Sequence, residues 1–177
     1  MHQLLLLRHA KSSWDSPELP DRERPLNPRG RHAAALMRKA MRDLGLEPDV
    51  ILVSTARRTR ETLEGLEPWT ETPLLEELDS LYLATPTMLL DVLRGVADTA
   101  RSVLVVGHNP GLHELALALV GPPAPTELHQ DPMRDLTRGF PSGALAEFSV
   151  ALPWSRLTEG GGQLVRFITP RGLEVAG

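Results

Sequence analysis

The 177-residue sequence contains no cysteine and few aromatic residues. Without cysteine there can be no disulfide bond, no thiolate nucleophile and no cysteine-based zinc site. Aromatic side chains make up only 4% of the chain, so leucine, valine and alanine must form most of the core. No apolar run approaches the roughly 20 residues that a membrane-spanning helix needs. We therefore expect a cytoplasmic globular protein with no membrane partner.

Charge is distributed unevenly along the chain. Residues 1–60 carry 12 Lys and Arg against 7 Asp and Glu, whereas residues 61–177 carry 7 against 16. The formal net charge of −4 and the isolated tryptophans argue against a nucleic-acid partner, which would need a basic surface with stacking aromatics. The basic first third instead indicates a region that binds a small anion.

Three short, continuously apolar runs predict the inner strands of a parallel sheet, because such strands are covered on both faces. These runs are residues 4–7, 50–53 and 103–106. A weaker signal predicts a strand at 74–78. Two further runs, 144–152 and 163–169, predict a hairpin at the sheet edge, joined by the triple-glycine turn at 160–162.

Helix signals follow the strand runs. Asn27 and Thr85 are typical N-caps, since each precedes a proline that opens a segment with apolar residues at helical spacing. A basic helix is predicted after Ser54, and another is expected to start at Asn109 and the proline after it. Residues 121–139 are rich in proline and charge, which predicts an irregular loop.

The alternation of strands and helices, without a linker or an internal repeat, predicts one domain over residues 1–177. Its expected fold is a three-layer α/β sandwich, with a mostly parallel central sheet and helices on both faces. Ligands of open α/β sheets bind beyond the carboxyl ends of the strands. The polar residues that follow the three strongest strand runs are Arg8, His9, Ser54, Arg57, Arg58 and His108.

These side chains suit a phosphoryl group. Guanidinium groups match phosphate oxygens in bidentate fashion, and a helix that starts at Asn109 would add backbone N–H donors beside His108. A neutral imidazole can attack phosphorus to give a covalent phosphohistidine, and an unperturbed pKa near 6.5 permits this at pH 7. Fixed cations then stabilise the charge of the transition state. The sequence therefore indicates phosphoryl transfer.

The ordered motifs "LLRHA", "VSTARRTRET" and "VVGHNPG" resemble those of the histidine phosphatase superfamily, which includes phosphoglycerate mutases. Within it, "RHAKSSW", "DRERPLNPRG" and "GHNPGL" are most similar to the SixA-type phosphohistidine phosphatases. The resemblance covers about residues 3–150. It implies a phosphoglycerate mutase-like fold and a metal-independent hydrolase that needs no cofactor and forms a phosphohistidine intermediate.

The resemblance also implies roles for single residues. His9 is expected to be the nucleophile and Arg8 its phosphate-binding neighbour. Arg58, four residues after Ser54, matches the second phosphate ligand and is preferred to Arg57. His108 resembles the histidine that contacts the phosphoryl group opposite the nucleophile.

Further residues match stretches beside the family's pocket. Ser12 and Asn109 are candidate substrate ligands, although Ser12 could equally be an ordinary loop serine. Arg24 and Gly30 lie in a matching stretch, where a loop anchor and a helix-turn glycine are equally good interpretations. Ala10 replaces the glycine that usually follows the RH pair, a substitution that the SixA-like group shares.

The proton donor is the point where the sequence departs from the family. Members that act on phosphate esters usually present a glutamate followed by glycines, whereas "LLEELDSLY" offers Glu76 and Glu77 without them. We assign Glu77 by alignment, with Asp21 as the rival. An alkoxide leaving group needs a general acid, but imidazole is a much better leaving group. The weak donor signal therefore favours a phosphohistidine substrate.

Several alternatives stay open at this stage. A small-molecule phosphomonoesterase or a phosphoglycerate mutase-like enzyme would share the same first step. Metal-dependent hydrolysis through His9 and His108 is disfavoured, because His113 and Glu114 point to other helix faces and no further ligands follow. The expected partner is a phosphorylated protein or a small phosphorylated substrate, and the sequence leaves the oligomeric state open.

Overall fold

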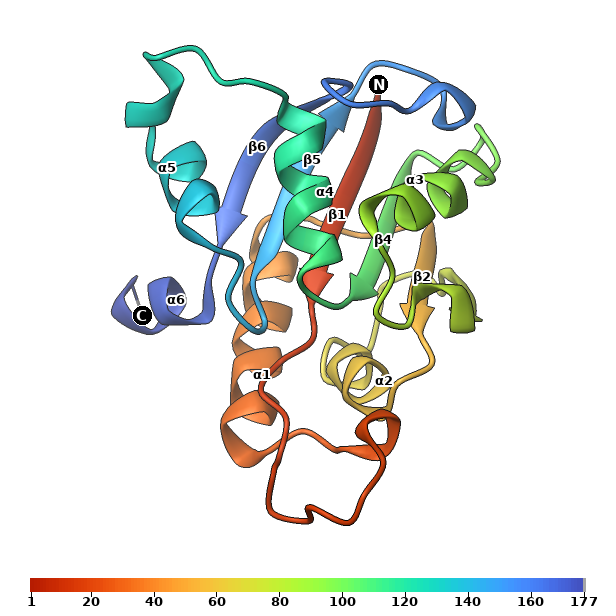
Figure 1. Cartoon of the computed structure of the whole chain (residues 1–177), viewed down its shortest axis with the longest axis vertical. Coiled ribbons are helices and arrows are strands. Elements are labelled where there is room, and N and C mark those ends of the chain that lie inside the picture. Colours follow the sequence, from red (N-terminus) through yellow and green to blue (C-terminus); the bar gives the residue numbers. More distant parts are fainter. Residues whose placement is uncertain (177) are drawn as a thin grey trace.

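The computed structural model describes residues 1–176 and shows a central sheet covered by helices on both faces (Figure 1). Its strands are β1 (His2–Arg8), β2 (Val50–Ser54), β3 (Leu74–Leu78), β4 (Ser102–Gly107), β5 (Leu145–Val150) and β6 (Gly162–Ile168). They lie in the order β3-β2-β4-β1-β5-β6, and β5 runs antiparallel to both of its neighbours. The other pairings are parallel, which confirms the predicted mostly parallel α/β sandwich.

The helices form the two outer layers. They are α1 (Pro28–Asp43), α2 (Arg57–Glu64), α3 (Pro86–Arg94), α4 (Gly111–Val120), α5 (Asp131–Arg138) and α6 (Pro170–Ala176). In Figure 1, α3 and α4 lie in front of the sheet. Short 3-10 helices at Asp21–Glu23, Asp79–Leu81, Glu127–His129 and Trp154–Arg156 connect the longer elements. No helix within residues 1–176 is both long enough and apolar enough to cross a bilayer.

Strand β1 divides the core into two halves. Leu4 and Leu6 pack toward α3 and α4, whereas Leu5 and Leu7 pack toward α1 and α2, and all four are fully buried. This explains the continuous leucine run, because alternating side chains of one strand must fill both halves.

The register of β1 with β4 sets the position of the site. Arg8 pairs with Gly107, so both strands end at the same level. His9 and His108 follow directly, and the His9 backbone N–H donates to the Gly107 carbonyl over 3.1 Å. The two histidines predicted from strand ends are therefore neighbours at one edge of the sheet.

The predicted caps explain where two helices begin. The Asn27 side chain accepts a hydrogen bond from the backbone N–H of Gly30 at 2.8 Å. The Thr85 hydroxyl accepts a hydrogen bond from the backbone N–H of Met88 at 3.2 Å. The prediction for α4 was wrong in detail: that helix begins at Gly111, and Asn109 instead donates from Nδ2 to the Phe140 carbonyl at 2.9 Å.

Three other predictions need correction in the second half of the chain. Residues 121–139 are not wholly irregular, because Met133 and Leu136 are buried on one side of α5. The link between β5 and β6 is longer than a triple-glycine turn: it includes the fully buried Trp154, and Gly162 already belongs to β6. Helix α6 ends the described chain and was not predicted.

Candidate active site

A cavity of about 430 Å³ opens where β1, β2 and β4 end. In Figure 1, the arrowheads of these strands point toward the loop of residues 9–27, drawn in red and orange. The cavity is lined by Arg8, His9, Lys11, Ser12, Trp14, Arg24, Asn27, Arg58, Leu83, His108, Asn109 and Ser142. The structure thus brings together both histidines and both arginines that the sequence singled out. Among residues 1–176, no carboxylate side chain lines this cavity.

His9 is buried and held as a neutral imidazole. Its Nδ1 lies 2.7 Å from the Ala10 carbonyl, which can only accept, so Nδ1 carries the proton. Burial lowers the pKa of His9 to about 4; the Ala10 hydrogen bond opposes this shift, and the nearby arginine charges, Arg58 foremost, add to it. A neutral ring with the proton on Nδ1 carries its lone pair on Nε2, which is the form that can attack phosphorus.

His108 lies beside His9, with 5.4 Å between the ring centroids. Its Nε2 is 2.7 Å from the Ser54 hydroxyl, and its Nδ1 is 3.4 Å from Nη2 of Arg58. Since a guanidinium can only donate, Nδ1 accepts and Nε2 donates to Ser54. Burial, followed by the influence of His9 and Arg58, lowers the pKa of His108 to about 3, so this ring is also neutral.

The two arginines keep donors without a protein partner. Arg58 is buried and donates from Nη1 to the Asp21 carbonyl at 2.7 Å and from Nη2 to the Asp21 carboxylate at 3.0 Å. Arg8 donates from Nη1 to the Phe140 carbonyl at 3.0 Å. Within the described chain, the Nε atoms of both arginines are buried and make no hydrogen bond. Such unsatisfied buried donors indicate a missing acceptor, and an anion would supply one.

Comparison of the sequence with known proteins identifies the family to which the chain belongs. The profile of the histidine phosphatase superfamily (branch 1) matches residues 4–81. An uncharacterised protein of Mycobacterium leprae is 32% identical over 170 residues, which cover 93% of this chain and 100% of the relative. The chain belongs to the histidine phosphatase superfamily.

Solved structures of this histidine phosphatase's relatives agree. A candidate SixA phosphohistidine phosphatase of Nakamurella multipartitia superimposes with a TM-score of 0.81 at 29% identity, covering 96% of each chain. Its counterpart from Agrobacterium tumefaciens gives a TM-score of 0.79 at 29% identity, covering 96% of this chain and 98% of the other. The predicted resemblance to SixA-type proteins is confirmed, and the family supports a phosphatase activity.

Asp21 lies beside the cavity of the histidine phosphatase as an ionised group. Its carboxylate accepts hydrogen bonds from the Tyr82 hydroxyl, from Arg58 and, at 3.2 Å, from Nε of Arg24. Desolvation alone would raise the pKa of Asp21, but the bonds from Tyr82 and Arg58 outweigh it and lower the pKa to about 2. At neutral pH Asp21 is therefore poorly suited to donate a proton, and it holds Arg58 in place instead.

Glu77 is not brought to the cavity. It lies on the edge strand β3, opposite Val53 of β2, and both it and Glu76 are exposed. β3 is separated from the histidine-bearing strands β1 and β4 by β2, so Glu77 is displaced from the phosphoryl pocket. Arg57 also points elsewhere: its Nε binds the Glu61 carboxylate at 3.1 Å on the surface.

The remaining sequence candidates hold the loop that follows β1. The Ser12 hydroxyl accepts from Nη1 of the buried Arg24 at 2.9 Å, so both residues anchor the cavity wall. Gly30 lies so close to the loop that a Cβ would be 2.1 Å from the Lys11 carbonyl oxygen. Only glycine allows α1 to approach the residues that follow His9 at this distance.

Sequence reasoning missed five residues at or beside the cavity: Lys11, Trp14, Tyr82, Leu83 and Ser142. Tyr82 meets the His108 ring edge-on, with 5.4 Å between centroids, and Trp14 and Leu83 line the mouth. Tyr82 is the single tyrosine of the chain, and Trp14 lies in the quoted "RHAKSSW" motif. Both residues stand out in the sequence, but their positions in space depend on loops whose course periodicity does not predict.

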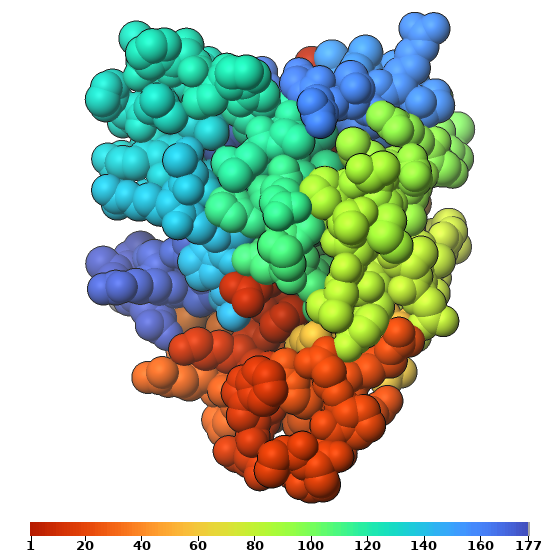
Figure 2. All heavy atoms as spheres, in the orientation of Figure 1, coloured from red at the N-terminus to blue at the C-terminus, as the bar shows by residue number. Residues whose placement is uncertain are grey.

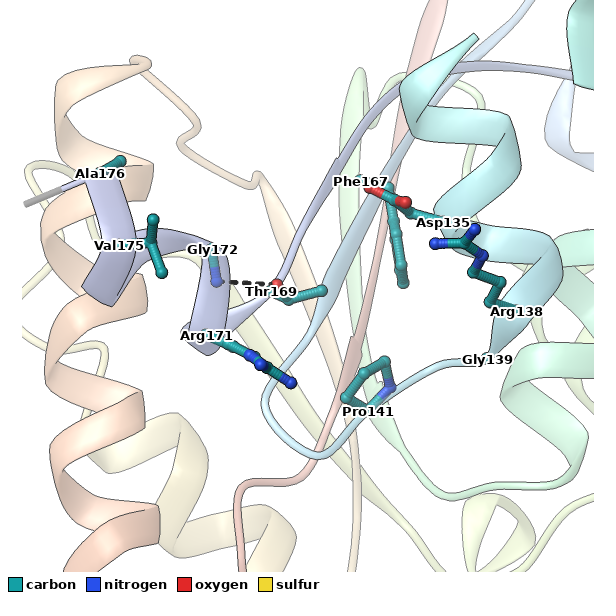
Figure 3. Close-up of a pocket in the computed structure, with 10 residues that line it drawn as sticks. All are labelled: Asp135, Arg138, Gly139, Pro141, Phe167, Thr169, Arg171, Gly172, Val175 and Ala176. Carbon is teal, nitrogen blue, oxygen red and sulfur yellow. Dashed lines mark hydrogen bonds between the residues drawn. The ribbon is translucent and has the colours of Figure 1, made fainter. Parts of the chain in front are cut away.

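Two other hollows lie toward the C-terminal end of the described chain. The first, which we call the hollow beside α6, has a volume of about 590 Å³ and lies between α5, β6 and α6; Figure 3 shows Arg138 and Arg171 on opposite sides of it. The other, of about 700 Å³, shares Lys11 and Ser142 with the cavity that contains His9. It also includes the exposed Arg29, Arg171 and Glu174, so its charged lining is mostly basic.

Proposed function

We propose that this chain is a SixA-type protein phosphohistidine phosphatase that works through a covalent phosphohistidine at His9, without a metal ion or a cofactor. One observation carries the proposal: a neutral imidazole lies in a cavity lined by Arg8, Lys11, Arg24 and Arg58 and by no carboxylate of the described chain. This environment favours a phosphoryl anion and supplies a nucleophile. It supplies no obvious acid for a basic leaving group.

In the first step, the lone pair on Nε2 of His9 attacks phosphorus. A P–N bond forms to His9 while the P–N bond to the substrate imidazole breaks. If the distal nitrogen of that imidazole carries a proton, the ring leaves as neutral imidazole and needs no further proton. An ester would release an alkoxide, which needs a general acid that the cavity lacks.

The arginines stabilise the transferring group. Charge spreads over three equatorial oxygens in such transition states, and the guanidinium groups of Arg8 and Arg58 line the cavity that contains His9. Asp21 and Tyr82 fix the Arg58 guanidinium, so it does not reorganise when the phosphoryl group arrives. His108, neutral and anchored by Ser54, lies next to the nucleophile and limits the movement of both rings.

In the second step, water attacks the phosphorus of phosphorylated His9. The P–N bond breaks, inorganic phosphate leaves, and the electron pair returns to Nε2. The water proton passes to the phosphate and the solvent. Because the unloaded ring has a pKa of about 4, His9 is again neutral at pH 7 and ready for another cycle.

A protein substrate is supported by the names of the structural relatives, which are described as phosphohistidine phosphatases. The hollow that shares Lys11 and Ser142 with the His9 cavity also offers an extended partner a place to bind beside it. A cytoplasmic setting and a single domain over residues 1–177 stay predictions. The alternative is a small-molecule phosphomonoesterase or a mutase-like enzyme.

A turnover panel tests the proposal. The purified chain would be assayed with a phosphohistidine-bearing protein, p-nitrophenyl phosphate and 3-phosphoglycerate, each with and without EDTA. We expect the highest kcat/KM on the phosphohistidine protein, unaffected by EDTA. A higher kcat/KM on either ester, isomerisation of phosphoglycerate, or loss of activity in EDTA would overturn it.

A further inference from the structure

Two large apolar side chains lie exposed at the mouth of the catalytic cavity. Trp14 is 73% exposed and Leu83 is 53% exposed, yet both line the cavity that contains His9 and His108. They come from segments far apart in the sequence, the loop after β1 and the loop before α3. Figure 2 shows these regions meeting, the red-to-orange spheres directly below the yellow-green ones. Exposed apolar groups gathered at a cavity indicate a contact surface.

The Trp14 ring is held in position rather than free. The guanidinium carbon of Arg24 lies over it, 3.5 Å from the ring centroid. Arg24 is itself buried and donates to Ser12 and Asp21, so it is a fixed platform. A cation–π contact of this kind orients one face of the indole against the protein and leaves the other face open.

Leu83 adopts an unfavourable backbone conformation. Its φ of 50° lies in the left-handed region, which side chains other than glycine, asparagine and aspartate rarely occupy. The segment cannot relax easily, because Ala84 packs against the start of α4, where a Cβ on Gly111 would be 1.9 Å from the Ala84 carbonyl oxygen. Strain of this kind persists where the surroundings impose it, and it clusters at functional sites.

The in-line geometry of phosphoryl transfer indicates a role for Trp14 and Leu83. Attacking and leaving atoms lie in line through phosphorus, so the leaving group must project away from His9. His9 is buried in the wall of the cavity, whereas Trp14 and Leu83 are its most exposed apolar lining residues. The leaving group therefore meets an apolar mouth after a cationic interior.

We propose that Trp14 and Leu83 form an apolar clamp that holds the imidazole ring of the departing histidine and so selects ring-bearing leaving groups. A flat neutral ring stacks well on an open indole face and against a leucine side chain. The inference rests on the proposed function and adds to it the residues that recognise the leaving group.

The test compares two substrates that share a P–N bond and differ in the ring: N-phosphorylimidazole and phosphoramidate. The measured quantity is the ratio of their kcat/KM values at pH 8, with uncatalysed hydrolysis subtracted. We expect Trp14→Ala and Leu83→Asn each to lower this ratio at least tenfold. Trp14→Phe keeps a flat face and should recover at least half of the wild-type ratio. Leu44→Asn, at an exposed leucine outside the cavity, should leave the ratio unchanged.

Leu83→Asn also separates recognition from structure, because asparagine tolerates the left-handed conformation. We expect its midpoint of thermal unfolding to equal or exceed that of the wild type while the substrate ratio falls. Equal losses on both substrates, or an unchanged ratio in both Trp14→Ala and Leu83→Asn, would overturn the clamp. If the wild type hydrolyses neither P–N substrate, the proposed function itself fails, which is a different result.

Discussion

The catalytic cavity and the hollow beside α6 differ in a way that size does not explain. The hollow beside α6 is larger, about 590 Å³ against 430 Å³. None of the ten residues in Figure 3 is buried. The catalytic cavity, in contrast, contains buried His9, Arg58 and His108, and the pKa of each histidine is strongly lowered. Buried polar groups held without full partners, rather than volume, distinguish the site.

The largest expected effect separates the two hollows directly. His9→Ala removes the nucleophile, so turnover of a phosphohistidine protein should fall at least about 10⁴-fold, while the thermal unfolding midpoint changes little. Arg138→Ala, at an exposed arginine that lines the hollow beside α6 and neither the His9 cavity nor the hollow adjoining it, should alter turnover less than about twofold. Steady-state kinetics on both purified variants make the comparison. Turnover in His9→Ala within about tenfold of the wild type would show that His9 is not the nucleophile.

The next effect compares two adjacent arginines. Arg58→Lys keeps the charge but loses the fork that binds Asp21 and faces the cavity, so kcat should fall about 10²-fold. Arg57→Lys changes only a surface ion pair with Glu61 and should stay within about twofold. Reversed magnitudes, measured under saturating substrate, would assign the phosphoryl contact to Arg57.

The acid limb of the pH profile should reflect buried histidines. Because the pKa of His9 is lowered to about 4, the loss of kcat/KM caused by protonation of the nucleophile should occur as the pH drops through about 4, once the separately measured titration of the substrate has been divided out. A half-maximal point near 6.5 would show an unperturbed nucleophile. Arg138 does not line the cavity that contains His9, so the profile should not change in Arg138→Ala.

The free energy of unfolding should also depend on pH through the two buried histidines, His9 and His108. An unfolded histidine binds a proton below about pH 6.5, whereas folded His9 and His108 stay neutral down to about 4 and 3. The unfolded state therefore binds more protons in this window, and the free energy of unfolding should decrease as pH falls from 6.5 to 4. Denaturant titrations of His108→Asn should show a shallower decrease, since one of the two groups is gone. An identical slope would contradict the buried neutral ring.

A smaller effect compares two glycines. Gly30→Ala would force a Cβ against the Lys11 carbonyl, so unfolding free energy should drop by about 1–3 kcal/mol and turnover should fall with it. Gly139, in the hollow beside α6, has open space around its Cβ position, and Gly139→Ala should stay within about 0.5 kcal/mol. Urea unfolding of both variants decides whether the loop after His9 needs this close approach.

The smallest effect concerns Glu77. Because it is exposed on β3 and does not line the cavity, Glu77→Gln should change kcat/KM less than about threefold on phosphohistidine and on esters. Selective loss of ester hydrolysis would restore Glu77 as the proton donor and show that β3 lies closer to the substrate during turnover.

Much of the fold was predictable because β1, β2 and β4 contain continuous apolar runs and two helices carry explicit caps. Helix α5 was not, since only Met133 and Leu136 are buried in it and no side chain caps it. Its stability depends on packing against α4 and β6, which a local pattern does not reveal.

The residues of the site also differ in whether the sequence could predict their positions. His9 and His108 follow strand ends, so the sheet's register fixes them, and Arg58 was preferred because it matches the family motif that starts at Ser54 of β2. Tyr82, Trp14 and Leu83 reach the cavity from irregular segments, where no periodicity predicts direction. Glu77 was assigned from a family pattern that this chain lacks, and the edge position of β3 keeps it away.

The stereochemical course at phosphorus tests the central claim most directly. A phosphohistidine analogue made chiral at phosphorus with sulfur and ¹⁸O would be hydrolysed in ¹⁷O-enriched water, and the configuration of the released thiophosphate determined. Two successive in-line displacements, first by His9 and then by water, predict net retention. Net inversion would show that water attacks the substrate directly, and it would contradict the covalent intermediate on His9.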